Sequence, residues 1–181
     1  MKRCLLLIAI GGMLGCGAAV KKDAESKAAE PKAAVAQAEV KVDIKNYDGV
    51  MALVKSHQGK IVVMDAWSTS CEPCIKEFPG LVALHKKYGP GKVACISLSC
   101  DYIGLGKPEE LVEPVLKFLK EQGATFDNVL SSDDSDALFA KLKLPSIPAV
   151  FIYNPDGTLN KRFENEFSYR DVEAHVATLV K

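Results

Sequence analysis

The chain has 181 residues, 48% of them hydrophobic, with 23 basic and 23 acidic side chains. This length and composition suit one globular domain plus some additional sequence. A net charge of zero gives no electrostatic reason to expect a nucleic acid or a strongly acidic substrate, so we expect no nucleic-acid partner.

The first residues form a short basic start followed by an apolar run. Lys2 and Arg3 precede "CLLLIAIGGMLG", which is too short to span a bilayer as a permanent helix and is typical of an export signal. The run ends in "GGMLGC", which resembles a bacterial lipoprotein signal, in which the cysteine is lipidated and becomes the mature N-terminus. We therefore expect a signal peptide at residues 1–15 and a lipid anchor on Cys16. An ordinary cleaved signal and an uncleaved anchor are the alternatives.

The next stretch, residues 16–40, is rich in Ala, Lys and Glu. It has no large apolar residue to bury, so it cannot form a core and predicts a tether. Its length would let the following domain, residues 41–181, work away from a membrane surface. We expect an extracytoplasmic, membrane-anchored lipoprotein in a compartment that favours oxidation of thiols.

Three apolar runs in the domain predict buried strands. They are "KIVVMDAW" at 60–67, "VACISLS" at 93–99 and "PAVFIYN" at 148–154. Each is nearly continuous and rich in branched residues, as expected of strands covered on both faces. The last run leads through the tight turn "NPDGT" into another strand-like run, which predicts an antiparallel hairpin.

Helical patterns lie between and after these strands. Residues 74–88 carry an apolar side and stop at the breaker "GPG". The segment 113–123 has Pro114 in its first turn and Gly123 where a helix would end. A last helix is expected over about 169–180. Strands alternating with helices, then a hairpin and a helix, predict an α/β domain with a central mixed sheet flanked by helices.

The stretch "DAWSTSCEPCIKEFP", residues 65–79, places two cysteines between a strand and a helix. Cys71 falls at the helix N-terminus, where unpaired N–H groups and the helix dipole stabilise a thiolate. Cys74 lies one turn further and should be more buried. This suits a resolving thiol, which attacks the mixed disulfide that the first thiol forms. A structural bridge in a non-catalytic binding module is the alternative.

Asp65 is the unusual residue of the first predicted strand. An ionised carboxylate among buried apolar neighbours is unfavourable, so its pKa should be raised. Such a carboxylate near Cys74 could accept the proton of that thiol, directly or through a water. Alternatively, Asp65 lies at the strand edge and is merely solvated.

Several residues around the cysteines recur at the spacing of the thioredoxin superfamily. They are Asp65, Trp67, Cys71, Cys74 and Pro79. The stretch "IPAVFIYNPDGT" looks like the cis-proline strand and hairpin of that superfamily. The long segment between residues 95 and 148, and the sequence "CEPC" itself, are similar to the TlpA/ResA-like membrane-tethered thiol-disulfide oxidoreductases. The resemblance covers about residues 40–181.

The resemblance implies a thioredoxin-like three-layer sandwich in which Pro148 is cis and lies beside the dithiol, offering its backbone to an extended substrate. A trans proline opening a strand is the alternative. The implied catalytic residues are Cys71, Cys74 and Asp65. The implied supporting residues are Trp67, Glu72, Pro73, Ile147 and Pro148.

The resemblance also implies an enzyme, a reductase of protein disulfides without a cofactor. Its substrates would be disulfide-containing proteins, with apocytochrome c in cytochrome c maturation as a candidate. A membrane thiol-disulfide transporter would donate the electrons. Two departures leave the redox direction open: Ser70 stands where many relatives carry a tryptophan, and the acid Glu72 opposes a thiolate at Cys71.

Cys95 and Cys100 lie five residues apart on one predicted strand. They should point to opposite faces about 16 Å apart at ~3.3 Å per residue, too far to form a bridge. We expect Cys95 to be a buried thiol, and Cys100, at the carboxyl end of the strand, to be structural or to exchange with Cys71. A metal site of all four thiolates is a competing reading, since the spacing approaches a zinc pattern. We expect no metal, and we expect the three histidines to serve surface or packing roles.

Overall fold

The computed structural model describes residues 39–180. The expected signal peptide at 1–15, nearly all of the expected tether at 16–40 and the expected anchor Cys16 lie outside the described residues. Within the described part, no helix combines the length and apolar character that crossing a membrane requires.

Strands and helices alternate along the described chain. The strands are β1 (Asp43–Lys45), β2 (Ile61–Trp67), β3 (Val93–Ser99), β4 (Asp127–Ser131), β5 (Ala149–Tyr153) and β6 (Leu159–Glu164). The helices are α1 (Tyr47–Ser56), α2 (Glu72–Lys92), α3 (Val112–Gln122), α4 (Ser135–Leu142) and α5 (Tyr169–Leu179), with a short 3₁₀ helix, η1 (Pro108–Leu111), before α3.

The strands form one mixed sheet in the order β1-β4-β3-β2-β5-β6. The first four strands in that order run parallel. β5 is antiparallel to β2, and β6 is antiparallel to β5. The predicted mixed sheet and C-terminal hairpin are therefore confirmed. β2 and β3 are buried along their whole length, as their continuous apolar sequences predict.

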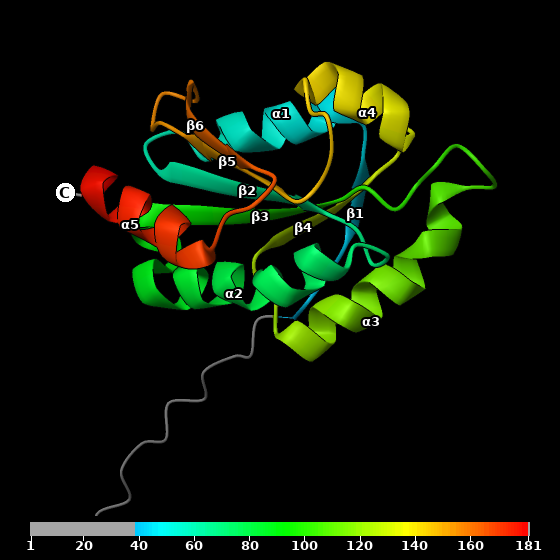
Figure 1. Ribbon diagram of the computed structural model, residues 1–181, viewed down its shortest axis with the longest axis horizontal. Helices are drawn as coiled ribbons and strands as arrows, with labels where there is room; N and C mark the ends of the chain where they lie inside the picture. The colour runs from blue at the N-terminus through cyan, green and yellow to red at the C-terminus, as the bar shows by residue number, and fades with distance from the viewer. Residues whose placement is uncertain (1–38, 181) are drawn as a thin grey trace, which may run out of the picture. The chain divides into compact units, whose positions relative to one another are not determined.

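Helices cover both faces of the sheet and make three layers (Figure 1). α2, α3 and α5 pack on one face, over a core that includes Val63 and Trp67 of β2. α1 and α4 pack on the other face, over Val62 and Met64. Successive residues of a strand point to opposite faces, which explains how one strand supplies both cores.

Glycine and proline set the ends of the helices on the dithiol side of the sheet. α3 has Pro114 in its first turn and ends at Gly123, whose φ of 67° closes the helix in the left-handed conformation, as predicted. In α2 the predicted stop at Gly89 is a kink, with φ of 63°, after which a last helical turn continues to Lys92.

Candidate active site

The turn from β2 into α2 carries the two paired cysteines. Cys71 is the N-cap of α2, and its Sγ accepts a hydrogen bond from the backbone N–H of Cys74 at 3.4 Å. The two cysteines form a disulfide with their Cα atoms 5.2 Å apart. Cys71 is half-buried and Cys74 is buried, in the order that the sequence predicts. Cys71 is therefore the more accessible cysteine of the pair, and it lies at the positive end of a helix.

The turn before Cys71 is held by polar side chains, of which the sequence analysis singled out only Ser70. Asp101, just after β3, accepts hydrogen bonds from the hydroxyl of Ser68 at 3.0 Å and from the backbone N–H of Thr69 at 2.9 Å. Ser70, noted above for replacing a tryptophan, hydrogen bonds through its hydroxyl to that of Ser68 at 2.9 Å. A polar hydrogen-bonded turn thus stands where an apolar shield would otherwise lie.

The peptide bond between Ile147 and Pro148 is cis, which confirms the prediction made from the family resemblance. Pro148 is buried directly before β5, and the register pairs Ala149 with Ala66 near the end of β2. Pro148 and Pro73 both line a groove of about 390 Å³ that extends to the loop between β6 and α5. This groove lies along the first turns of α2, just after the cysteine pair begins.

Asp65 is 3% exposed in the centre of the sheet, so the alternative of a solvated strand edge is wrong. Burial raises its pKa from 3.8 to about 7, and the nearby negative charge of Glu77 adds to the increase. The hydroxyl of Tyr169 donates a hydrogen bond to Asp65 Oδ2 at 2.5 Å and partly offsets that increase. A carboxyl group with this pKa can take up and release a proton near neutral pH.

Tyr169, Glu77 and Gly80 form the part of the site that sequence reasoning missed. The Glu77 carboxylate accepts the backbone N–H of Tyr169 at 3.1 Å, joining the start of α5 to α2. Gly80 of α2 lets the tyrosine ring approach closely, since a Cβ placed there would lie 2.2 Å from Tyr169 Cβ. A glycine inside a helical pattern was the available signal, because such a glycine often marks close packing.

The remaining supporting residues divide between core and surface. Trp67 is fully buried, and its ring lies 5.0 Å from that of Phe78 and 4.7 Å from that of Phe118, so it supports the floor under α2. Its Nε1 finds no hydrogen-bond partner among the described residues. Glu72 is exposed in the first turn of α2, and Ile147 is partly buried against both cores.

Cys95 and Cys100 are both buried, and they belong to the cores on opposite faces of the sheet, as predicted. Burial raises the pKa of both thiols well above the ordinary value. A metal bound by four thiolates would require the sulfurs of Cys95 and Cys100 to meet those of Cys71 and Cys74 at one point. The positions of Cys95 and Cys100 on opposite faces of the sheet do not support such a site. Among residues 39–180 no group of three or more metal-ligating side chains has an arrangement that could hold an ion.

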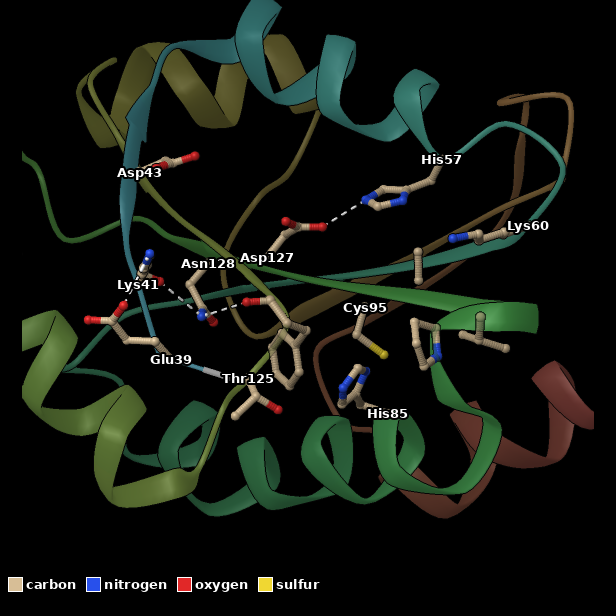
Figure 2. A pocket seen from close by; sticks show the side chains of 14 residues that line it. Glu39, Lys41, Asp43, His57, Lys60, His85, Cys95, Thr125, Asp127 and Asn128 are labelled. Carbon is tan, nitrogen blue, oxygen red and sulfur yellow. Dashed lines mark hydrogen bonds and ion pairs between the residues drawn. The ribbon is translucent and has the colours of Figure 1, made fainter. Parts of the chain in front are cut away.

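A separate pocket of about 490 Å³ lies at the end of the sheet where β3 and β4 begin (Figure 2). His57 Nε2 pairs there with Asp127 Oδ2 at 2.7 Å, and Cys95 and His85 also line the pocket. The His85 ring packs against Phe126, with the ring centroids 5.2 Å apart. This pocket is formed at the other end of the strands from the dithiol.

Comparisons with known proteins agree with the fold and the cysteine pair. The chain is 24% identical over 140 residues to thiol-disulfide oxidoreductase ResA of Geobacillus kaustophilus, covering 77% of this chain and 73% of that protein. It is 29% identical over 104 residues to ResA of Bacillus subtilis, covering 58% of this chain and 52% of that protein.

Solved structures show the same fold. The thioredoxin domain of a thiol-disulfide oxidoreductase from Bacteroides vulgatus matches with a TM-score of 0.57 and 21% identity, covering 70% of this chain and 83% of that one. A secreted disulfide oxidoreductase of Mycobacterium tuberculosis, homologous to E. coli DsbE, matches with a TM-score of 0.54 and 24% identity, covering 68% and 85%. The predicted thioredoxin-like fold is confirmed.

These relatives confirm the predicted resemblance to thiol-disulfide oxidoreductases, and the close pair Cys71 and Cys74 fits the dithiol of such an enzyme. Residues 32–162 match the AhpC/TSA family, which is well over half of the chain. The chain therefore belongs to the AhpC/TSA family.

Proposed function

We propose that this chain is an extracytoplasmic thiol-disulfide oxidoreductase that reduces protein disulfides through Cys71 and Cys74. The observation that carries the proposal is the disulfide at the start of α2, whose outer sulfur is half-buried and whose inner sulfur is buried. The groove beside Pro148 and the raised pKa of the buried Asp65 carboxyl group support the proposal, because the reaction needs a place for a substrate segment and an acceptor for the Cys74 proton.

The reaction begins with both cysteines reduced. The Cys71 thiolate attacks one sulfur of the substrate disulfide, so that a mixed disulfide forms and the other substrate sulfur leaves as a thiolate. Cys74 then loses its proton and attacks Cys71 Sγ, which forms the Cys71–Cys74 disulfide and releases the second substrate thiolate. Two electrons pass from the enzyme dithiol to the substrate. We propose that Asp65 accepts the proton of Cys74 and then passes it to the solvent or to the released thiolate.

A reductase in an oxidising compartment must be recharged after each cycle. We propose that a membrane thiol-disulfide transporter supplies two electrons to the Cys71–Cys74 disulfide, which regenerates both thiols. The substrates are proteins that carry accessible disulfides. The family resemblance suggests apocytochrome c, and with it a role in cytochrome c maturation.

Insulin reduction tests the activity. The full chain with excess dithiothreitol should precipitate the insulin B chain, while Cys71→Ser and Cys74→Ser should lose the catalysed rate. Cys100→Ala, which removes a buried thiol outside the dithiol, should keep it. Loss of activity in Cys100→Ala with retention in Cys71→Ser would contradict the assignment.

The reduction potential tests the direction. A value below roughly −220 mV would agree with a reductase, whereas a value near −120 mV would identify an oxidase. Equilibration of the Cys71–Cys74 pair with glutathione buffers, read by alkylation and mass spectrometry, gives this value.

The proposed location rests on the sequence of residues 1–40. We propose a signal peptide at 1–15, a lipid-modified Cys16 and a tether to the folded domain. The description of the M. tuberculosis relative as secreted supports export. Mass spectrometry of the mature N-terminal peptide from bacterial membranes should find a diacylglyceryl group on Cys16, and Cys16→Ser should leave the protein unprocessed. A mature protein that begins elsewhere without lipid would refute the anchor.

A further inference from the structure

Two of the large apolar side chains that the described chain exposes lie in one short loop. Ile103 is 65% exposed and Leu105 is 76% exposed, in the segment between β3 and η1. The other such side chain among residues 39–180 is Leu159, 51% exposed at the start of β6. A single exposed aliphatic residue is ordinary, but two that are separated by only one glycine on a projecting loop make a small apolar surface. We call residues 102–106 the apolar loop.

The apolar loop is tied directly to the turn that carries Cys71. Asp101, the residue before the loop, accepts the hydrogen bonds from Ser68 and Thr69 described above. The hydroxyl of Ser99 donates to the other oxygen of Asp101 at 2.6 Å. The carboxylate thus joins the end of β3 to the turn that leads into the dithiol.

The backbone of the loop also has a defined shape. The backbone N–H of Ser135 donates to Tyr102 O at 2.8 Å, and the Tyr102 hydroxyl donates to Gly106 O at 3.4 Å. Gly104 and Gly106 flank Leu105 with φ values of 81° and 70°, a left-handed conformation that other residues rarely adopt. Fixed backbone contacts therefore present the two aliphatic side chains to solvent.

The loop and the cysteine pair both follow the carboxyl ends of strands, at the same end of the sheet. β2 and β3 are parallel neighbours, with Trp67 paired to Ser99, so the turn to Cys71 and the apolar loop leave the sheet side by side. Figure 1 shows the segment after β3 projecting beyond the strand on the side where α2 begins. A polypeptide that reaches Cys71 from the side of β3 would meet this loop, because the loop follows the strand next to β2 and is joined to the turn before Cys71 through Asp101.

We propose that the apolar loop is a docking surface for substrate segments with aliphatic side chains next to the disulfide. This deepens the proposed function and rests on it. Aliphatic flanks of this kind are usually buried in folded proteins, so the surface would favour polypeptides that are not fully folded. A membrane surface fits less well, because Lys107 is accompanied by the acidic Asp101, Glu109 and Glu110 and no basic cluster is present in this segment.

Two synthetic peptides with the same internal disulfide test the proposal. One carries Leu and Val beside the cysteines, and the other carries Ser and Asn. Second-order rate constants for reduction by the pre-reduced full chain should favour the aliphatic peptide by about tenfold. The double variant Ile103→Ser/Leu105→Ser should lose that preference. Leu159→Ser, which removes an exposed leucine at the opposite end of the sheet, should keep the preference for the aliphatic peptide.

The possible results separate the docking proposal from the proposed function. If the wild-type chain reduces neither peptide, the proposed function fails. If the wild type and the double variant both reduce the two peptides at equal rates, the function stands and the docking proposal is overturned. Slower alkylation of Cys71 in the double variant would also overturn it, because the loop would then act on the thiolate. Loss of binding to phosphatidylglycerol-containing vesicles with the peptide preference intact would assign the loop to the membrane instead.

Discussion

Asp65 lies in the middle of the sheet between Met64 and Ala66, where water cannot solvate its charge. Its one side-chain hydrogen bond among residues 39–180 comes from Tyr169, on a helix that begins 104 positions later in the chain. Burial outweighs this hydrogen bond, and the pKa of the carboxyl group rises to about 7. The same burial that brings the pKa of the Asp65 carboxyl group near neutrality also makes the ionised form unfavourable for stability.

We predict that Asp65→Asn changes how stability depends on pH. Between about pH 4 and pH 7 the folded wild type keeps a proton on Asp65 that the unfolded chain has released. The contribution of Asp65 to the free energy of unfolding therefore falls as pH rises. The rise of the pKa from 3.8 to about 7, at ~1.4 kcal/mol per pKa unit, sets an upper limit of roughly 4 kcal/mol. Urea unfolding of the oxidised proteins at pH 4 and pH 8 should show the variant gaining stability over the wild type as pH rises.

Asp136→Asn is the matched control, since Asp136 is an exposed aspartate on α4. It should follow the wild-type pH dependence. If Asp65→Asn also follows the wild-type curve, Asp65 does not carry the raised pKa.

We predict that Tyr169→Phe raises the pKa of Asp65 further, because the variant removes a hydrogen bond that favours the ionised carboxylate. The unpaired buried carboxyl group should also lower the free energy of unfolding by about 1–3 kcal/mol. A ¹³C NMR titration of the Asp65 carboxyl carbon measures the pKa directly. Tyr153→Phe, which alters a buried tyrosine of the opposite core, should leave the titration unchanged, and an unchanged titration in Tyr169→Phe would refute the coupling.

At the scale of elements, α2 combines the dithiol with the packing that supports it. Its N-terminus holds Cys71 and Cys74, its inner face places Phe78 against Trp67, and Gly80 admits the first residue of α5. The closeness of α2 and α5 is therefore a condition for the hydrogen bond to Asp65. A substitution in the middle of α2 should therefore move Tyr169 of α5 and weaken its hydrogen bond to Asp65.

We predict that Gly80→Ala destabilises the protein by about 1–3 kcal/mol, although alanine is the better helix former. A Cβ at Gly80 would lie 2.2 Å from Tyr169 Cβ and Cγ, so the ring must move away from its place against α2. Gly91→Ala is the control, because a Cβ there meets nothing within 4 Å. Guanidinium unfolding should separate the two variants, and equal stabilities would show that the contact at Gly80 does not constrain α5.

The sequence predicted the elements whose signal is local. Continuous apolar runs located β2, β3 and β5, and proline and glycine located the ends of α3. The strands β1 and β4 were not picked out. β1 has only three residues, and β4 begins with the polar residues Asp127 and Asn128, so neither presents the continuous apolar run that marked the other strands. α1 and α4 were also missed, although Asn46 and Asp134 cap them with side-chain hydrogen bonds.

The residues of the candidate site also divide into those that the sequence indicated and those that only the folded structure revealed. The cysteine pair and Asp65 stand in one short stretch, and family resemblance added Pro148. Tyr169 could not be assigned from the sequence, because its contact with Asp65 exists only after α5 packs on the sheet. The burial of Asp65 in the central strand was likewise decided by the neighbouring strands and helices.

At the scale of the whole molecule, the cysteines of the folded domain divide into a disulfide-bonded pair and two buried free thiols. We predict that iodoacetamide leaves Cys95 and Cys100 unmodified in the native oxidised protein, because both are buried and the pKa of each thiol is raised. Unfolding in guanidinium should expose both to alkylation, while Cys71 and Cys74 should react only after reduction. Peptide mass spectrometry distinguishes the four sites, and rapid native labelling of Cys100 would support exchange with Cys71 instead.

The chemistry proposed for the dithiol is tested most directly by trapping its intermediate. The Cys74→Ser variant, mixed with a protein disulfide, should accumulate a mixed disulfide through Cys71 because the resolving thiol is absent. Mass spectrometry should identify that bond, and Cys71→Ser under the same conditions should form none. A Cys74→Ser variant that captures no substrate, with Cys71 alkylated no faster than free cysteine, would contradict the assignment of this chain as a thiol-disulfide oxidoreductase.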